Sequence, residues 1–300
     1  MNIKKWAFAF SAALGLTNAA FAQTDSAAQD KMLSEIEQMN AASATTAPAK
    51  RVYATFKGTY VQNFQSVESL GKGVFQMMVM HRFGKVNQGL YEFFGLDNAT
   101  TRIGFDYGIT KDWMVSAGRS SYGKMIDVAT KYRILAQTQD NSMPISLSVY
   151  PGMTITTLKQ PGKDWYKDKH RLTYFAQALI ARKFSENFSL QLMPTFIHFN
   201  LVAGPTDKND VFAVGIGGRY KLTKRLSLNA EYSYMPPGQV STTKVYNGLS
   251  AGFDLETGGH VFQFIFSNSR SMSVPGYVAG TTDSWGDGGI YFGFNLSRVF

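Results

Sequence analysis

The chain has 300 residues, of which 44% are hydrophobic and 17% charged, and its formal net charge at pH 7 is +9. The basic residues are spread singly and form no cluster with interleaved aromatic residues, which argues against a nucleic-acid-binding protein. The absence of cysteine excludes disulfides and the lipidated cysteine of a lipoprotein. Beyond the N-terminus, no sequence segment reaches the roughly eighteen continuous apolar residues of a membrane helix.

The first 22 residues have the pattern of a secretory signal. Lys4 and Lys5 are basic, residues 6–16 are apolar, and Ala20-Phe21-Ala22 is an A-x-A cleavage site. We therefore expect the mature chain to begin at Gln23. Residues 23–50 are rich in Ala, Ser, Thr and Gln, which predicts a flexible periplasmic segment with, as an alternative, a short helix.

From residue 51 onward the dominant pattern is an alternation of apolar and polar residues with a period of two, which predicts β-strands. It is clearest from Asp210 to Tyr234, where two runs flank the polar turn Thr223-Lys224 and predict a hairpin. Each run is about ten residues long, enough to cross a bilayer at a steep tilt. Thirteen such segments are present, at 51–62, 73–83, 100–109, 112–120, 125–135, 144–156, 170–184, 187–200, 211–222, 225–235, 248–257, 259–267 and 288–300.

The connections predict a single antiparallel transmembrane β-barrel with short periplasmic turns and longer extracellular loops. With both ends in the periplasm the strand number has to be even. We expect about twelve strands, with 51–62 not a full strand, or fourteen if one more is hidden in 84–98 or 268–287.

Alternation alone does not say which face is buried, and a secreted soluble β-protein is the alternative to a membrane barrel. Three features favour apolar residues facing lipid. The polar face is rich in Gly, Ser and charges of both signs, and Tyr and Trp lie near strand ends, as at membrane interfaces. The last strand ends on Phe300, which resembles the signal read by the barrel-assembly machinery. We therefore expect a bacterial outer-membrane protein in contact with outer-membrane lipid.

Seven short segments of the first half of the chain carry a family resemblance: 54–59, 65–68, 81–84, 93–99, 105–110, 118–121 and 131–135. Through them, residues 56 to about 137 resemble an uncharacterised β-barrel family of Bacteroidetes-type bacteria, the domain of unknown function DUF5777. The resemblance implies an outer-membrane barrel and carries no agreed activity.

The charged residues on the polar face are the candidates for lining a lumen. They predict either a polar pore with weak anion preference or a narrow lumen filled by cross-strand ion pairs. The candidates are Arg102, Asp106, Asp127, Lys131, Arg133, Lys183, Arg219, Lys221, Arg225, Glu231, Asp254 and Glu256.

The link 84–99 is too aromatic for an ordinary solvated loop. We expect it either to fold into the lumen as a constriction or to lie on the rim against lipid. Its candidate residues are Tyr91, Phe93, Phe94, Asp97 and Asn98.

The four histidines, at 81, 170, 198 and 260, have no paired metal-ligand spacing, so we expect no metal or other cofactor. The favoured function is a passive channel or transporter for a small polar solute. The alternatives are a hydrolase acting on lipid or peptide, in which His198 with Asn200 would work with an unidentified serine, and a closed structural or partner-docking barrel.

Overall fold

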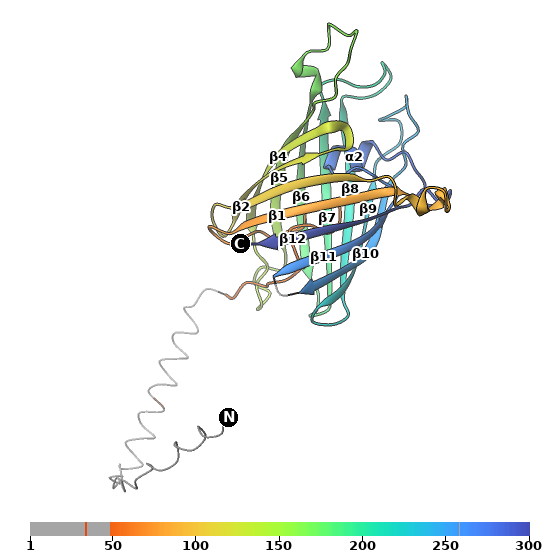
Figure 1. Ribbon diagram of the computed structural model, residues 1–300. Coiled ribbons are helices and arrows are strands. Elements are labelled where there is room, and N and C mark those ends of the chain that lie inside the picture. The colour runs from red at the N-terminus through yellow and green to blue at the C-terminus, as the bar shows by residue number, and fades with distance from the viewer. Residues whose placement is uncertain (1–33, 35–48, 258) are drawn as a thin grey trace, which may run out of the picture. The chain divides into compact units, whose positions relative to one another are not determined.

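A computed structural model of the chain describes residue 34, residues 49–257 and residues 259–300 (Figure 1). The chain divides into two units, residues 1–48 and 49–300. The predicted signal at 1–22 and nearly all of the predicted segment 23–50 lie outside the described residues. No described helix is long and apolar enough to span a membrane.

The second unit is a closed antiparallel β-barrel of twelve strands, in which each strand pairs with the next and the first pairs with the last. This confirms the predicted fold and strand number. The strands are β1 (Phe75–Lys85), β2 (Thr100–Gly108), β3 (Trp113–Ser120), β4 (Met125–Leu135), β5 (Ser146–Thr156), β6 (Leu172–Lys183), β7 (Phe188–Phe199), β8 (Asp210–Lys221), β9 (Leu226–Tyr234), β10 (Gly248–Thr257), β11 (His260–Ser267) and β12 (Tyr291–Val299).

The helices of this unit are short and lie between strands. The one α-helix among the described elements is α2 (Val274–Ala279), between β11 and β12. The 3-10 helices are Val86–Gln88, Phe93–Gly95, Tyr122–Lys124 and Asp168–Arg171.

Two rims close the barrel at its ends. At the rim we call the terminal rim, Phe75 and Phe300 exchange backbone hydrogen bonds, with N–O distances of 3.3 and 2.8 Å. The short connections β2–β3, β6–β7, β8–β9 and β10–β11 lie at this rim. The opposite loop rim carries the long connections β1–β2, β5–β6, β7–β8, β9–β10 and β11–β12.

The apolar side chains of the strands point away from the lumen. Val214 on β8 is 43% exposed and Leu228 on β9 is 48% exposed, while the alternate residues of the same strands are buried. Because this outer surface is apolar, it suits lipid rather than water.

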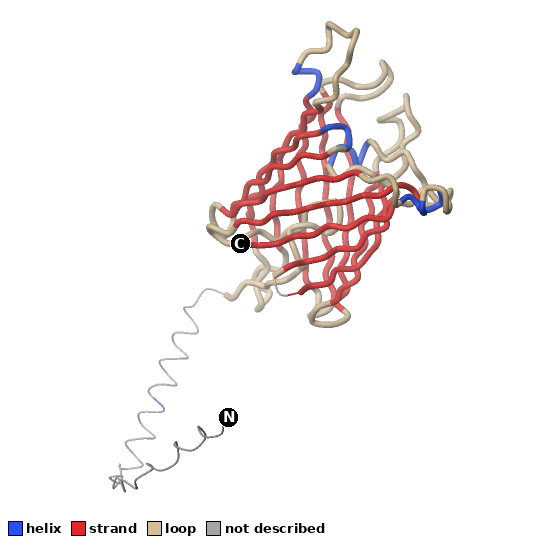
Figure 2. The backbone as a smooth tube through the Cα atoms, in the orientation of Figure 1, coloured by secondary structure: helices blue, strands red, loops and turns tan. Residues whose placement is uncertain are grey.

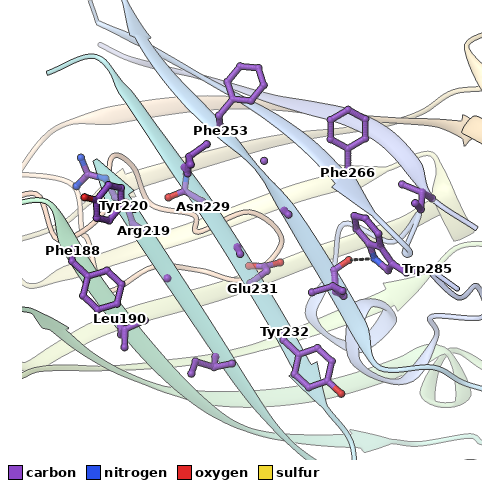
Figure 3. Close-up of a pocket in the computed structure, with 18 of the residues that line it drawn as sticks. Phe188, Leu190, Arg219, Tyr220, Asn229, Glu231, Tyr232, Phe253, Phe266 and Trp285 are labelled. Atoms are coloured by element: carbon purple, nitrogen blue, oxygen red, sulfur yellow. Dashed lines mark hydrogen bonds between the residues drawn. The ribbon is translucent and has the colours of Figure 1, made fainter. Parts of the chain in front are cut away.

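The outer wall contains an apolar groove of about 1020 Å³ across β8, β9 and β10. Its floor is formed by Gly218, Ala230 and Ala251, which are cross-strand neighbours with small side chains. Larger rings, such as Tyr232 and Phe253, stand beside it (Figure 3). Since these residues belong to the apolar outer face, the groove is part of the lipid-facing surface and not of the lumen.

The segment 51–62 is not a barrel strand, although its sequence alternates. Its strand-like pairing is limited to two isolated bridges, Arg51 with Thr138 and Tyr60 with Gln65. Side chains of the barrel wall satisfy much of its backbone instead, because the segment lies inside the barrel.

Candidate functional site in the barrel lumen

Residues 54–70 form a loop inside the barrel, which we call the lumen hairpin. The Ser66 N–H donates to the Thr59 carbonyl at 2.8 Å, and the Val61 N–H donates to the Phe64 carbonyl at 2.9 Å. These bonds place the tip of the hairpin at Gln62 and Asn63, both fully buried. Figure 2 shows tan loop segments within the ring of red strands.

The hairpin enters and leaves at the terminal rim. Before it, the Val52 N–H donates to the Gln137 carbonyl at 2.8 Å, and after it the Gly73 N–H donates to the Gly108 carbonyl at 2.7 Å. The Arg51 guanidinium is paired with Asp112 at 2.6 Å, and this hydrogen bond holds the pKa of the Asp112 carboxyl below its usual range. The entry point is therefore fixed to the β2–β3 turn.

The carboxylate of Glu231 on β9 holds the tip. It accepts hydrogen bonds from three consecutive backbone N–H groups, of Gln62 at 3.2 Å, Asn63 at 2.8 Å and Phe64 at 3.2 Å. Bonds to an ionised acceptor are stronger than neutral ones, and a buried carboxylate without them would bear its full cost of desolvation. Glu231 is thus the central attachment of the hairpin.

Lys131 on β4 holds the returning arm. Its ammonium group donates to the Gln65 side chain at 2.8 Å, to the Ser66 carbonyl at 2.9 Å and to the Glu68 carbonyl. All three ammonium donors are therefore used, which is what burial of a lysine requires.

Uncharged wall side chains satisfy further backbone groups of the hairpin. Gln191 accepts from the Val67 N–H at 2.7 Å and donates to the Gln65 carbonyl at 2.8 Å. Gln263 donates to the Val61 carbonyl at 2.9 Å, and Asn295 donates to the Gln62 carbonyl at 2.8 Å. The hairpin is thus held by a polar wall contributed by widely separated strands.

Arg102 and Asp127 form a buried ion pair on the wall between β2 and β4. The guanidinium Nε and Nη2 lie 2.9 and 2.5 Å from the two carboxylate oxygens. The cross-strand glycines Gly104 and Gly118 make room for it, because a Cβ at position 118 would lie 2.2 Å from Arg102 Nη2.

A second element, α2, reaches into the lumen from the loop rim. Val274, Tyr277 and Val278 of α2 are buried with residues of β5 to β8 in one apolar cluster, which also contains Phe64 of the hairpin. The Phe64 and Tyr277 rings meet edge to face with centroids 4.9 Å apart. The Tyr277 hydroxyl and Asn63 amide both contact the Ser250 hydroxyl, at 3.0 and 2.7 Å.

Little space remains where the two elements meet. A cavity there, lined by Tyr60, Arg102, Tyr150, Val274 and others, has about 20 Å³, room for about one water molecule. A larger cavity of about 300 Å³ lies toward the terminal rim, between the hairpin and the ends of β10 to β12. The residues that the structure describes therefore fill the middle of the lumen.

The predicted lumen residues fall into three groups by burial. Arg133, Lys183, Lys221 and Glu256 are partly buried toward the terminal rim, and Arg225 is exposed in the β8–β9 turn. Seven are buried: Arg102, Asp106, Asp127, Lys131, Arg219, Glu231 and Asp254.

Sequence reasoning missed Arg82 and the hairpin itself. Arg82 on β1 is fully buried and donates to the Asn63 side chain at 2.9 Å and to Asn295 at 3.0 Å. Arg82 shares its face of β1 with Gln76, Met78 and Met80, so the alternation of polar and apolar residues is only a weak signal there. The amides Gln191, Gln263 and Asn295 were missed because only charged residues were considered.

The link 84–99 does not form the constriction that was one of its two predicted roles. Tyr91 is 92% exposed, and Phe93, Phe94, Asp97 and Asn98 are also exposed. The backbone explains this position, because Phe93 and Phe94 have φ of 44° and 55° and the next residue, Gly95, packs directly on Gly84. The link therefore lies at the loop rim, and α2 reaches the lumen in its place.

The hypothetical hydrolase pair is not formed. His198 Nδ1 lies 2.6 Å from the Asp210 carboxylate, on the outward side of β7 and β8, and the Asn200 amide donates to the Lys169 carbonyl at 2.8 Å instead. Among the described residues, no group of three or more His, Asp or Glu side chains could hold a metal ion.

Comparison with known proteins identifies the class of barrel. The family DUF5777, described as a membrane bound beta barrel domain, matches residues 56–300. No curated protein matches the chain. Similar solved structures include the NanC porin and the KdgM porin, each with a TM-score of 0.45 and 9% sequence identity. Each match covers 75% of this chain, together with 98% of the NanC porin chain and 99% of the KdgM porin chain. The COG4313 outer membrane channel from Pseudomonas putida F1 has a TM-score of 0.44 and 13% identity over 78% of this chain and 98% of its own.

Proposed function

Because the chain belongs to the DUF5777 family of membrane-bound β-barrels, we propose that it is an outer-membrane channel for small polar solutes, gated by its own lumen hairpin. In the closed state the hairpin and α2 fill the barrel, and the channel opens when the hairpin withdraws toward the terminal rim. One observation carries this proposal: polar and charged side chains of the wall, led by Glu231 and Lys131, hold the hairpin backbone.

A polar attachment is reversible in a way that an apolar core is not. If the hairpin leaves, water can replace it as partner of Glu231, Lys131, Gln191 and Gln263 at little net cost. A barrel that only had to be filled would gain more from apolar residues, because burying charges is costly even when they are paired. The composition of the wall therefore favours a lumen that is wet for part of the time.

The topology of the hairpin also permits withdrawal. The hairpin is not one of the twelve strands that form the closed ring, and both of its ends are at the terminal rim. Its removal breaks no hydrogen bond between barrel strands. A closed structural barrel is the second candidate, favoured by the apolar contact between Phe64 and Tyr277, which water would not replace.

The deciding experiment removes the hairpin. Replacing residues 55–69 by a short Gly/Ser linker should give stable single-channel conductance in planar bilayers, whereas the unmodified chain should be closed with rare openings. Heat-modifiable migration in gel electrophoresis checks that the barrel has folded. A folded deletion variant that conducts no more than the unmodified chain would favour the closed structural barrel.

A further inference from the structure

A small basic cavity lies at the terminal rim, between the base of the hairpin and the wall of β6 to β9. Its volume is about 160 Å³, the share of about five water molecules in the liquid. Five of its lining residues are basic and one is acidic: Lys57, Lys183, Arg219, Lys221 and Lys224 against Glu186, with Ala54 completing the lining. The lining side chains thus carry a net charge of +4.

Three of these cations have protein partners. Arg219, 4% exposed, donates to the Ala54 carbonyl at 2.7 Å and to the Ser227 hydroxyl at 3.0 Å. Lys57 pairs with Glu256 and donates to the Lys224 carbonyl at 2.8 Å, and Lys183 lies 3.2 Å from Glu186.

Lys221 and Lys224 differ from these three cations. Among the residues that the structure describes, no carboxylate lies within 4.0 Å of the ammonium groups of Lys221 and Lys224. Cations gathered in a partly enclosed space repel one another, and a bound anion would remove this repulsion.

The backbone at the cavity is also unusual. Ala54 has φ of 57°, in the left-handed region that a residue with a side chain rarely adopts. In this conformation its carbonyl accepts the hydrogen bond from Arg219. Strained residues of this kind concentrate at ligand sites and switches. The strain at Ala54 therefore supports a functional role for the base of the hairpin.

From this geometry we infer that the cavity binds a phosphate oxyanion, either free inorganic phosphate or the phosphate group of a small solute. Lysine and arginine are the residues that supply charge-assisted hydrogen bonds to phosphate oxygens. Lys221 and Lys224 supply ammonium donors that no carboxylate of the described residues occupies, and Lys57 supplies a cation from the hairpin itself.

The site also affects the gate, and this consequence rests on the proposed function. The cavity exists only while the hairpin is inserted, because Ala54 and Lys57 form one of its sides. A ligand that binds one of two states shifts the equilibrium toward that state. Phosphate at the terminal rim therefore stabilises the closed channel.

The test measures phosphate binding to the full mature chain in detergent, by calorimetry and by the shift in thermal unfolding, against chloride at equal ionic strength. The double variant Lys221→Gln/Lys224→Gln removes the charges of the two lysines that have no carboxylate within 4.0 Å among the described residues. It leaves the side-chain hydrogen bonds between the hairpin and the barrel wall in place. Lys111→Gln, at the β2–β3 turn of the same rim, is the matched control. We expect saturable binding to the unmodified chain and to the control, and about tenfold weaker binding to the double variant.

Absence of saturable binding beyond the effect of chloride, or equal binding to the double variant, overturns the site. Glycerol phosphate distinguishes the two sources: binding as tight as inorganic phosphate assigns the site to phosphorylated solutes, and much weaker binding assigns it to the free ion. Phosphate binding is measured on the closed, full mature chain, whereas gating is tested by the conductance of the hairpin-deletion variant. A negative result in one experiment is therefore distinguishable from a negative result in the other.

Discussion

At the scale of single residues, Glu231 is the attachment on which the hairpin depends most. Its carboxylate accepts hydrogen bonds from the three N–H groups at the tip. In Glu231→Gln the side chain keeps its size, but one acceptor oxygen is replaced by an NH₂ group whose two donors face the backbone donors. We expect the attachment of the hairpin to weaken by about 1–3 kcal/mol.

Chymotrypsin, which cleaves after aromatic residues, should therefore cut the Glu231→Gln variant within the hairpin, after Tyr60 or Phe64, faster than the unmodified chain. The strands should stay protected. Glu186→Gln at the exposed β6–β7 turn serves as the control, since the Glu186 carboxylate lies at the terminal rim, 3.2 Å from Lys183, and not at the tip of the hairpin. Equal cleavage rates in all three proteins would contradict the role of Glu231.

The glycine at position 118 has a different role, because it makes room for the guanidinium of Arg102. In Gly118→Ala the new Cβ would lie 2.2 Å from Arg102 Nη2 and 2.5 Å from its Cζ, so the ion pair with Asp127 has to shift. We expect a loss of about 1–3 kcal/mol of stability, seen as a lower midpoint of thermal unfolding. Gly58→Ala is the control, because a Cβ there meets nothing within 4 Å. A midpoint unchanged by Gly118→Ala would show that Arg102 moves freely.

At the scale of elements, the strands were predictable because each is fixed by its own alternation. The predicted strands 211–222 and 225–235 differ by only one residue at each end from β8 (Asp210–Lys221) and β9 (Leu226–Tyr234). Lipid on one side and a polar interior on the other set the side-chain pattern locally, so no distant contact is needed to recognise it.

The lumen hairpin was not predictable in this way. The segment 51–62 alternates like a strand, and what distinguishes it is the set of distant partners, such as Glu231, which is 169 residues from Gln62. Such contacts leave no local pattern. The sequence contains a weak signal for the inner helix α2, because Val274 to Ala279 is an apolar run within an otherwise polar link. The link 84–99 has more aromatic residues and was therefore the segment predicted to constrict the lumen, but its candidate residues are exposed.

The hairpin blocks the lumen and α2 narrows the path beside it, which predicts how their deletions combine. Replacing residues 272–281 by a Gly/Ser linker removes Tyr277 and its contact with Phe64 but leaves the hairpin in the lumen. We expect little conductance from this deletion alone and more conductance from the double deletion than from the hairpin deletion alone. Single-channel recording of the three folded variants provides the comparison. A deletion of α2 that conducts as well as the double deletion would show that the hairpin is no barrier.

At the scale of the whole molecule, the charge of the interior is arranged along the barrel axis. Among the buried wall residues, Arg82, Arg102, Lys131 and Arg219 are balanced in number by Asp106, Asp127, Glu231 and Asp254. The excess of positive charge lies at the terminal rim, where Lys183, Lys221 and Lys224 line the basic cavity. The predicted weak anion preference therefore depends on the mouth of the channel and not on its middle.

This arrangement can be measured in the hairpin-deletion variant. In a KCl gradient its reversal potential should indicate about a twofold preference for chloride over potassium, since charges at a mouth raise the local concentration of counter-ions. Adding Lys221→Gln and Lys224→Gln should reduce the preference toward none, whereas Lys111→Gln should leave it unchanged. High salt should weaken the preference, because charges at a wet mouth are screened. Preference for potassium in the hairpin-deletion variant would mean that ions do not pass the basic mouth, and the assignment of this rim to the conduction path would fail.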